Sequence, residues 1–234
     1  MPDEQLDLRI STERAAGLPD RVPVMQPGQG DGPFDDPDFL FEPWWPGVRA
    51  LAWVEHGRLT RLRAEGMAEP MRGFAELADE LPERLMADGV VLDGWLLALD
   101  EGGWLDVDLL RRRVAGDRRA GRPAFVAADL LWTDGASWTR RSFHARRRRL
   151  ESVLLDGDRC VVSHALRGEG TLLAEALGRF GLQGLSARNL RARVRDGVAP
   201  DAWLRLPIGA AQRPIERPRL ALIQRLPLDD GSAG

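Results

Sequence analysis

The chain has 234 residues, 44% of them apolar, and a formal net charge of −3. This length and apolar content allow one large domain or two small ones around a sizeable core, and they exclude wholesale disorder. The acidic balance gives no overall attraction for nucleic acid or for an anionic membrane. The single cysteine, Cys160, excludes an internal disulfide framework and predicts a reducing, cytoplasmic location.

The N-terminal stretch is acidic and lacks an apolar core, so we expect no signal peptide. No apolar run approaches the ~20 residues of a membrane helix, which predicts no membrane partner. All 33 basic residues are arginine, because the sequence contains no lysine. No lysine amine is therefore present in this chain for nucleophilic or Schiff-base catalysis.

The chain order predicts a lead-in, one domain and a tail. Residues 1–37 are rich in Pro, Gly and Asp, and they predict a partly flexible segment that follows the surface. Strand-like and helix-like patterns then alternate without a linker, so we expect a single α+β domain over 38–207. Residues 208–234 form a proline-punctuated tail that is too short for a second domain.

Within the domain, apolar periodicity and turn residues predict the individual elements. We expect a hairpin over 48–54 and 59–62, strands over 89–99, 125–132, 160–164, 184–188 and 202–206, and helices over 71–86, 106–114, 142–155 and 170–180. The last helix should end at a C-cap glycine, Gly181.

Five stretches in this order resemble the motifs of ATP-dependent DNA ligases, most closely those of bacterial end-joining repair. They are FEPWWPGVRA at 41–50, VVLDGWLLAL at 90–99, FVAADLLWTDG at 125–135, GLQGLSAR at 181–188 and AWLRLP at 202–207. The resemblance implies a nucleotidyltransferase fold, with two antiparallel sheets and flanking helices around an ATP pocket. Active members of that family use ATP and Mg²⁺ and adenylate a lysine. They also use a following oligonucleotide-binding domain, which the tail is not expected to hold.

The sequence departs from the family pattern at nearly every chemical position. The departures are Trp44 for the nucleophilic lysine, Pro46 for an aspartate, Trp95 for a glutamate, Ala128 for the adenine-stacking phenylalanine, Gln183 for the metal-binding glutamate, Arg188 for a lysine, and Arg205 with Pro207 for the final pair. An indole N–H has no usable lone pair, and arginine cannot be deprotonated to attack a phosphate. The resemblance implies nucleotide-binding positions at Glu42, Arg49, Ala128 and Asp129. The other matching positions, Asp93 among them, are expected mostly to shape turns or to pack.

These departures predict a catalytically inactive ligase-like domain, which acts in DNA repair or recombination as an accessory or interaction module. The expected partners are DNA or a DNA-repair protein, with no functional cofactor and no metal site. One alternative is an active ligase, as family membership implies. Another is a non-catalytic protein that binds DNA ends or nicks through arginine-rich faces, with candidates Arg111, Arg112, Arg146, Arg147, Arg148 and Arg149. The sequence does not indicate an oligomeric state.

Trp44 and Trp95 also suggest what happened to the nucleotide pocket. Two indoles enter where a lysine and a glutamate stood, and one phenyl ring leaves. We expect one of the indoles to fill the vacated adenine slot and convert the former pocket into packed core.

Overall fold

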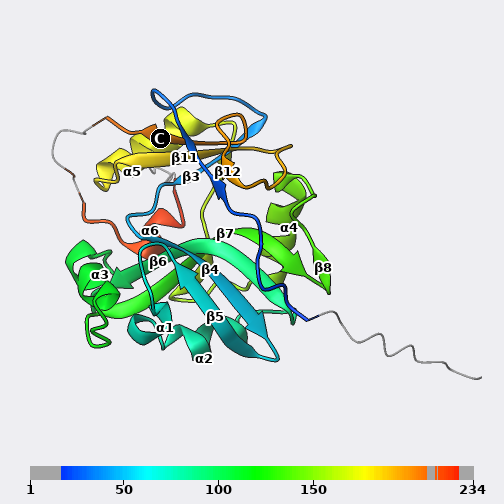
Figure 1. The fold of residues 1–234 in the computed structure, drawn as a ribbon. Helices are drawn as coiled ribbons and strands as arrows, with labels where there is room; N and C mark the ends of the chain where they lie inside the picture. The colour runs from blue at the N-terminus through cyan, green and yellow to red at the C-terminus, as the bar shows by residue number, and fades with distance from the viewer. Residues whose placement is uncertain (1–16, 210–213, 215, 227–234) are drawn as a thin grey trace, which may run out of the picture.

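The computed structural model describes residues 17–209, 214 and 216–226, and most of their strands belong to two sheets that face one another (Figure 1). The larger sheet contains β4 (Val48–Glu55), β5 (Arg58–Ala64), β6 (Val90–Leu99), β7 (Arg122–Thr133), β8 (Ala136–Ser137) and β9 (Cys160–Val162). The smaller sheet contains β2 (Gly28–Gln29), β3 (Phe39–Pro43), β10 (Leu166–Arg167), β11 (Gly184–Asn189) and β13 (Trp203–Pro207). A short ribbon pairs β1 (Met25–Gln26) with β12 (Gly197–Val198). The helices are α1 (Pro70–Gly73), α2 (Leu77–Glu83), α3 (Val107–Val114), α4 (Phe143–Val153), α5 (Gly170–Arg179) and α6 (Leu220–Ile223).

The expected α+β class is confirmed, although the sheets are not purely antiparallel. The larger sheet runs β5-β4-β6-β7-β8 and the smaller runs β10-β3-β11-β13-β2. Neighbours are mostly antiparallel, but β9 joins β7 and β2 joins β13 in parallel. Parallel strands cannot be joined by a tight hairpin, and both β9 and β2 lie far along the chain from the strand with which they pair.

The larger sheet forms where the sequence is most continuously apolar. Every residue of β6 is buried, as are most of β7, so both strands are covered on both faces. The expected hairpin is confirmed as β4 and β5, joined at His56 (φ 55°) and Gly57 (φ 65°). Two successive residues with positive φ match the right-handed twist of the flanking strands, and this allows the two-residue turn.

Two helices begin at side-chain caps that the sequence contains. The Asp106 carboxylate accepts hydrogen bonds from the backbone N–H groups of Asp108 and Leu109 at the start of α3. Ser142 accepts from Ala145 N at the start of α4. Each cap satisfies donors that the first turn of a helix leaves free. The helix at 170–180 is also confirmed as α5, followed by Gly181 at φ 72°.

The single helix expected over 71–86 is wrong, because the chain breaks into α1 and α2. Arg113 donates a hydrogen bond to the Gly73 carbonyl, which a continuous helix would use for its own backbone. A Cβ on Gly73 would lie 2.1 Å from the Arg113 carbonyl oxygen, so only glycine allows α3 to approach the chain this closely at the break. Phe74, Leu77 and Leu81 are fully buried all the same, so the apolar spacing identified the correct inward face.

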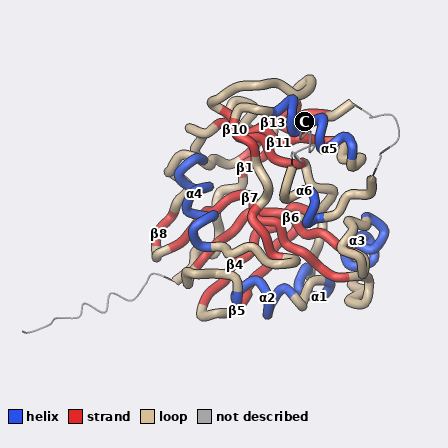
Figure 2. The backbone as a smooth tube through the Cα atoms, turned by 180° about the vertical axis from the view of Figure 1, so that it is seen from behind, coloured by secondary structure: helices blue, strands red, loops and turns tan. Residues whose placement is uncertain are grey.

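Helices cover both outer sides of the molecule. α1 and α2 lie under the larger sheet, on the side away from the smaller sheet, as Figure 2 shows, and α2 contacts β5 and β7. α4 packs on β7, α3 on β6, and α5 on β3 and β11. None of the helices in the described residues is long and apolar enough to cross a membrane.

Parts of the predicted lead-in and tail pack into the domain. Met25 is buried, and β1 and β2 pair with β12 and β13. α6 lies between the two sheets (Figures 1 and 2), and Leu220 and Ile223 join Trp45 and Trp95 in the inter-sheet core. The remaining lead-in and tail predictions, at 1–16, 210–213, 215 and 227–234, lie outside the described residues.

Candidate functional site

The segment 44–47 carries the chain from β3 in the smaller sheet to β4 in the larger sheet. Trp44 N donates to the Gly184 carbonyl oxygen over 2.9 Å, which ties this crossing to the start of β11. A Cβ on Gly47 would lie 2.5 Å from the Leu96 carbonyl oxygen, and one on Gly184 would lie 2.7 Å from the Trp44 Cβ. Glycine is therefore needed at both positions for the loop to lie against β6 and β11.

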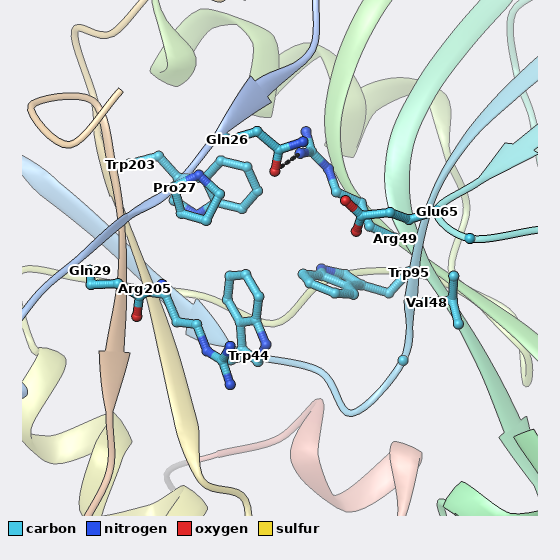
Figure 3. A pocket seen from close by; sticks show the side chains of 12 residues that line it. Gln26, Pro27, Gln29, Trp44, Val48, Arg49, Glu65, Trp95, Trp203 and Arg205 are labelled. Atoms are coloured by element: carbon cyan, nitrogen blue, oxygen red, sulfur yellow. Dashed lines mark hydrogen bonds between the residues drawn. The ribbon is translucent and has the colours of Figure 1, made fainter. Parts of the chain in front are cut away.

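Trp44 and Trp95 stand on the wall of a cavity of about 530 Å³ (Figure 3). Their rings meet edge to face, with centroids 4.8 Å apart. The other lining residues come from the lead-in, β4, the end of β5 and β13: Gln26, Pro27, Gln29, Gly47, Val48, Arg49, Glu65, Gly66, Trp203 and Arg205. Trp95 is 6% exposed and belongs to the inter-sheet core, but the expectation that the indoles fill the space is not met, because a cavity of this size remains beside them. The two indoles pack against each other, and this leaves open space beside them.

Arg49 is held rigidly on one side of this cavity. Its guanidinium makes a bidentate pair with Asp93, at 3.0 and 2.6 Å, and donates to the Met25 carbonyl. It also donates to the Gln26 side chain, as Figure 3 shows. Burial alone would lower the pKa of Arg49, but the facing Asp93 carboxylate raises it overall. The guanidinium also stacks 4.7 Å from the centre of the Trp203 ring. Asp93 is thus an ion-pair partner, and this corrects the expectation that it shapes a turn or packs.

A second group of charged side chains lies buried between the sheets. Arg146 from α4 makes a bidentate pair with Asp129 from β7, with both distances 2.8 Å, and Arg188 from β11 reaches the same carboxylate at 3.2 Å. Arg147 donates to Glu42 of β3 at 2.8 Å. Burial raises the pKa of Glu42, while Arg147 and Arg188 act in the opposite direction. We call these five side chains the buried ion network.

The buried ion network changes the roles expected for several residues. Arg146 and Arg147 were expected on an arginine-rich face, but they are 0% and 6% exposed and already paired. Asp129 and Glu42, both expected to contact nucleotide, pair with these arginines instead. Both Asp129 oxygens accept hydrogen bonds, whereas Glu42 Oε2 lies 3.5 Å from Arg188 Nε without a hydrogen bond. Arg188 also lies 4.2 Å from the centre of the Trp203 ring. The network therefore joins β3, β7, β11 and α4.

The remaining arginine candidates lie on the surface, and most of them are neutralised. Arg111 pairs with Asp108, Arg112 with Asp117, and Arg149 with Asp134. Arg148 is exposed and makes no ion pair with any described residue. Locally balanced charges attract a polyanion weakly, so these faces offer little support for DNA binding.

Of the other departures from the family pattern, Arg205 lines the 530 Å³ cavity, whereas Ala128 and Pro207 do not. Ala128 is buried within β7, Pro46 lies beside Trp44 in the connecting loop, and Pro207 is exposed at the end of β13. Gln183 is exposed at the start of the segment that leads into β11. Arg205 is exposed, and its guanidinium stacks 4.8 Å from the centre of the Trp44 ring.

Mg²⁺ and the transfer of an adenylyl group from ATP to a lysine, which the family resemblance implies, do not fit the residues present. Glu65 is the one carboxylate among the described residues that line the 530 Å³ cavity. Within the described part of the chain, no three His, Cys, Asp or Glu residues come together as a metal site. Gln183 is neutral and a poor ligand for a hard cation. No lysine occurs in the sequence to receive an adenylyl group.

Sequence reasoning missed several residues that shape the site. Gln26 and Glu65 line the cavity, but they lie in an expected lead-in and at the end of an ordinary strand. Trp203 was recognised only as a matching position, yet Arg49 and Arg188 both stack on it and Ser186 Oγ accepts its N–H at 2.8 Å. The contact of Arg49 with Trp203 joins strands far apart in the chain, and those of Arg188 and Ser186 with Trp203 follow from the antiparallel pairing of β11 with β13, which the sequence patterns did not predict.

No family model matches the chain. Among curated proteins, it is 29% identical over 200 residues to the multifunctional non-homologous end joining protein LigD of Mycolicibacterium smegmatis, which covers 84% of this chain and 25% of that protein. It is also 23% identical over 175 residues to the SPbeta prophage-derived DNA ligase-like protein LigB of Bacillus subtilis, which covers 74% of this chain and 63% of that one. The chain thus spans about a quarter of the length of the first of these relatives.

Two solved structures carry the same fold. The structure titled mycobacterial DNA ligase D complexed with ATP and MES superposes with a TM-score of 0.61 at 25% identity, over 80% of this chain and 60% of that one. The ligase domain of M. tuberculosis LigD gives a TM-score of 0.62 at 24% identity, over 79% of this chain and 58% of that one. The two facing sheets with their crossing loop have the fold of the nucleotidyltransferase domain of ATP-dependent DNA ligases. The chain is homologous to the ligase domain of LigD.

Proposed function

We propose that this chain is a ligase-like module of end-joining DNA repair that works by binding rather than by joining strands. The observation that carries this proposal is Trp44, which occupies the nucleophile position on the loop between the two sheets. Its backbone is bonded to Gly184, and its ring is wedged between Trp95 and the Arg205 guanidinium. The expected partners are DNA or a DNA-repair protein.

Among the described residues that line the 530 Å³ cavity, no other side chain supplies the nitrogen nucleophile that adenylation requires. A nucleophile for the α-phosphate needs an available lone pair, and the indole nitrogen has none to offer. Arg49 and Arg205 can hold phosphate, but a guanidinium stays protonated and cannot attack it. Asp93 and Asp129 face arginines at hydrogen-bond distance, so recruiting either of them to Mg²⁺ would take a buried guanidinium away from its bidentate carboxylate partner.

The competing function is an active ATP-dependent ligase, as the names of the relatives suggest. Intact-mass measurement after incubation with ATP and Mg²⁺ separates the two, with the homologous ligase domain of M. tuberculosis LigD as the positive control. We expect the control to gain one AMP and to seal a nicked duplex, and this chain to do neither. A stoichiometric AMP adduct on this chain, or a sealed nick, would overturn the proposal.

A further inference from the structure

Arg205 lies between two cavities of similar size. The first is the 530 Å³ cavity of Figure 3, and the second, of about 500 Å³, lies between the 44–47 loop, the start of α3 and the 181–184 segment. Trp44, Gly47 and Arg205 line both cavities, so the Trp44 ring with its stacked guanidinium forms their shared wall.

Each cavity has aromatic or aliphatic side chains on part of its wall, next to polar groups. The first presents the indoles of Trp44, Trp95 and Trp203. The second is lined by Leu105, Leu110 and Leu182 together with Trp45, and the Gln183 amide is its polar side chain beside Arg205. Walls of this kind suit planar rings, because aromatic faces stack on nucleobases regardless of base identity.

We call the two cavities together the cleft. The charged side chains that line it favour a single phosphate between the two cavities. Asp93 neutralises Arg49 through its bidentate contact. Arg205 is exposed and forms no ion pair with any described residue, so its guanidinium is available to an anion. Glu65, also exposed, adds a negative charge to the far part of the first cavity. With Arg49 neutralised, the described residues of the first cavity present one unpaired cation, Arg205, and one carboxylate, Glu65, which would repel the additional charges of a triphosphate.

We propose that this cleft binds a short single-stranded DNA end as a splayed dinucleotide. One base lies in each cavity, on either side of Trp44, and the phosphodiester between them is bound by Arg205. The guanidinium can bind two phosphate oxygens at once, while Trp44 holds the two bases apart. This inference rests on the proposed non-catalytic function, since it places DNA where an active ligase would hold ATP.

The test measures binding of fluorescein-labelled duplexes by anisotropy. The duplexes share one sequence and end either blunt or with a two-nucleotide single-stranded overhang, of 3′ or 5′ polarity. We expect one overhang to bind at least about tenfold more tightly than the blunt end, because each stacked base contributes on that scale. Arg205→Gln and Trp44→Leu should each remove most of this preference.

Arg148→Gln is the matched control, because Arg148 is also exposed and unpaired among the described residues but lies on α4, outside both cavities. It should leave the overhang preference unchanged. Arg205 is a surface side chain, so Arg205→Gln should melt like the unaltered protein. The overhang preference of Arg205→Gln therefore tests the proposed binding site even if Trp44→Leu fails to fold.

Three results would overturn the inference. They are equal affinity for blunt and overhanging ends, an equal loss of preference in Arg148→Gln and Arg205→Gln, and displacement of the overhang by free ATP at lower concentration than by a dinucleotide. Each is independent of the AMP adduct, which is measured by mass without DNA. A chain that gains no adduct and shows no overhang preference would refute the binding site and leave the non-catalytic assignment standing.

Discussion

Removing the charge of Asp129 is expected to cost a large part of the stability of the domain. Its carboxylate accepts two hydrogen bonds from Arg146, one from Arg188 and one from Leu130 N, and it is 1% exposed. Asp129→Asn keeps the shape of the side chain but turns an N–H₂ group toward guanidinium donors. Glu42 is then the one carboxylate left in the buried ion network. Breaking a buried pair in this way costs about 3–5 kcal/mol, against a total stability of about 5–15 kcal/mol.

The control for this experiment is Asp134→Asn. Asp134 also forms a bidentate contact with an arginine of α4, Arg149, but the two side chains are 53% and 31% exposed. An exposed pair contributes about 0–1 kcal/mol, and asparagine tolerates the positive φ of 55° at this position. Both variants are compared with the unaltered chain by urea unfolding, followed by circular dichroism at pH 7. If Asp129→Asn costs no more than Asp134→Asn, the buried ion network does not hold the two sheets together as argued.

Three further outcomes follow from buried groups and close approaches. Burial lowers the pKa of His164, so the unfolded chain binds more protons below about pH 6.5, and stability should fall as the pH drops below that value. His164→Gln should show a smaller loss of urea midpoint between pH 7.5 and 5.5, and an identical loss would contradict the assignment. Burial raises the pKa of Cys160 to about 12, so the native thiol should resist a disulfide reagent at pH 8 and react on unfolding, whereas rapid labelling of the native chain would refute this. A Cβ on Gly94 would lie 2.3 Å from the Val126 carbonyl oxygen, while one on Gly32 would meet nothing within 4 Å; Gly94→Ala should therefore cost at least about 1–3 kcal/mol and Gly32→Ala almost nothing, as thermal melting would show.

Several features of this protein could be predicted from local patterns. The hairpin at β4 and β5, the buried strands β6 and β7, and helices α3, α4 and α5 all follow from apolar periodicity, turn residues and caps near them in the chain. The order of the five motifs was enough to predict the nucleotidyltransferase fold, which the solved LigD structures share. The absence of lysine, and with it the doubt about adenylation, is visible without any structure.

Contacts between distant segments required the tertiary structure. Arg146 and Arg149 lie on the same helix and look alike in sequence, yet one is fully buried against β7 and the other pairs at the surface. The break between α1 and α2 depends on Arg113, which lies on another helix. The position of Trp44 depends on Trp95, whose ring meets it edge to face, and on Arg205, whose guanidinium stacks on it. Residue types and spacing determined the elements and their inward faces, whereas the partner of each charge and the space beside each ring were decided only when the two sheets met. The reason is physical: propensity and periodicity act over a few residues, while ion pairs and cavities depend on which distant strands come within a few ångströms of one another.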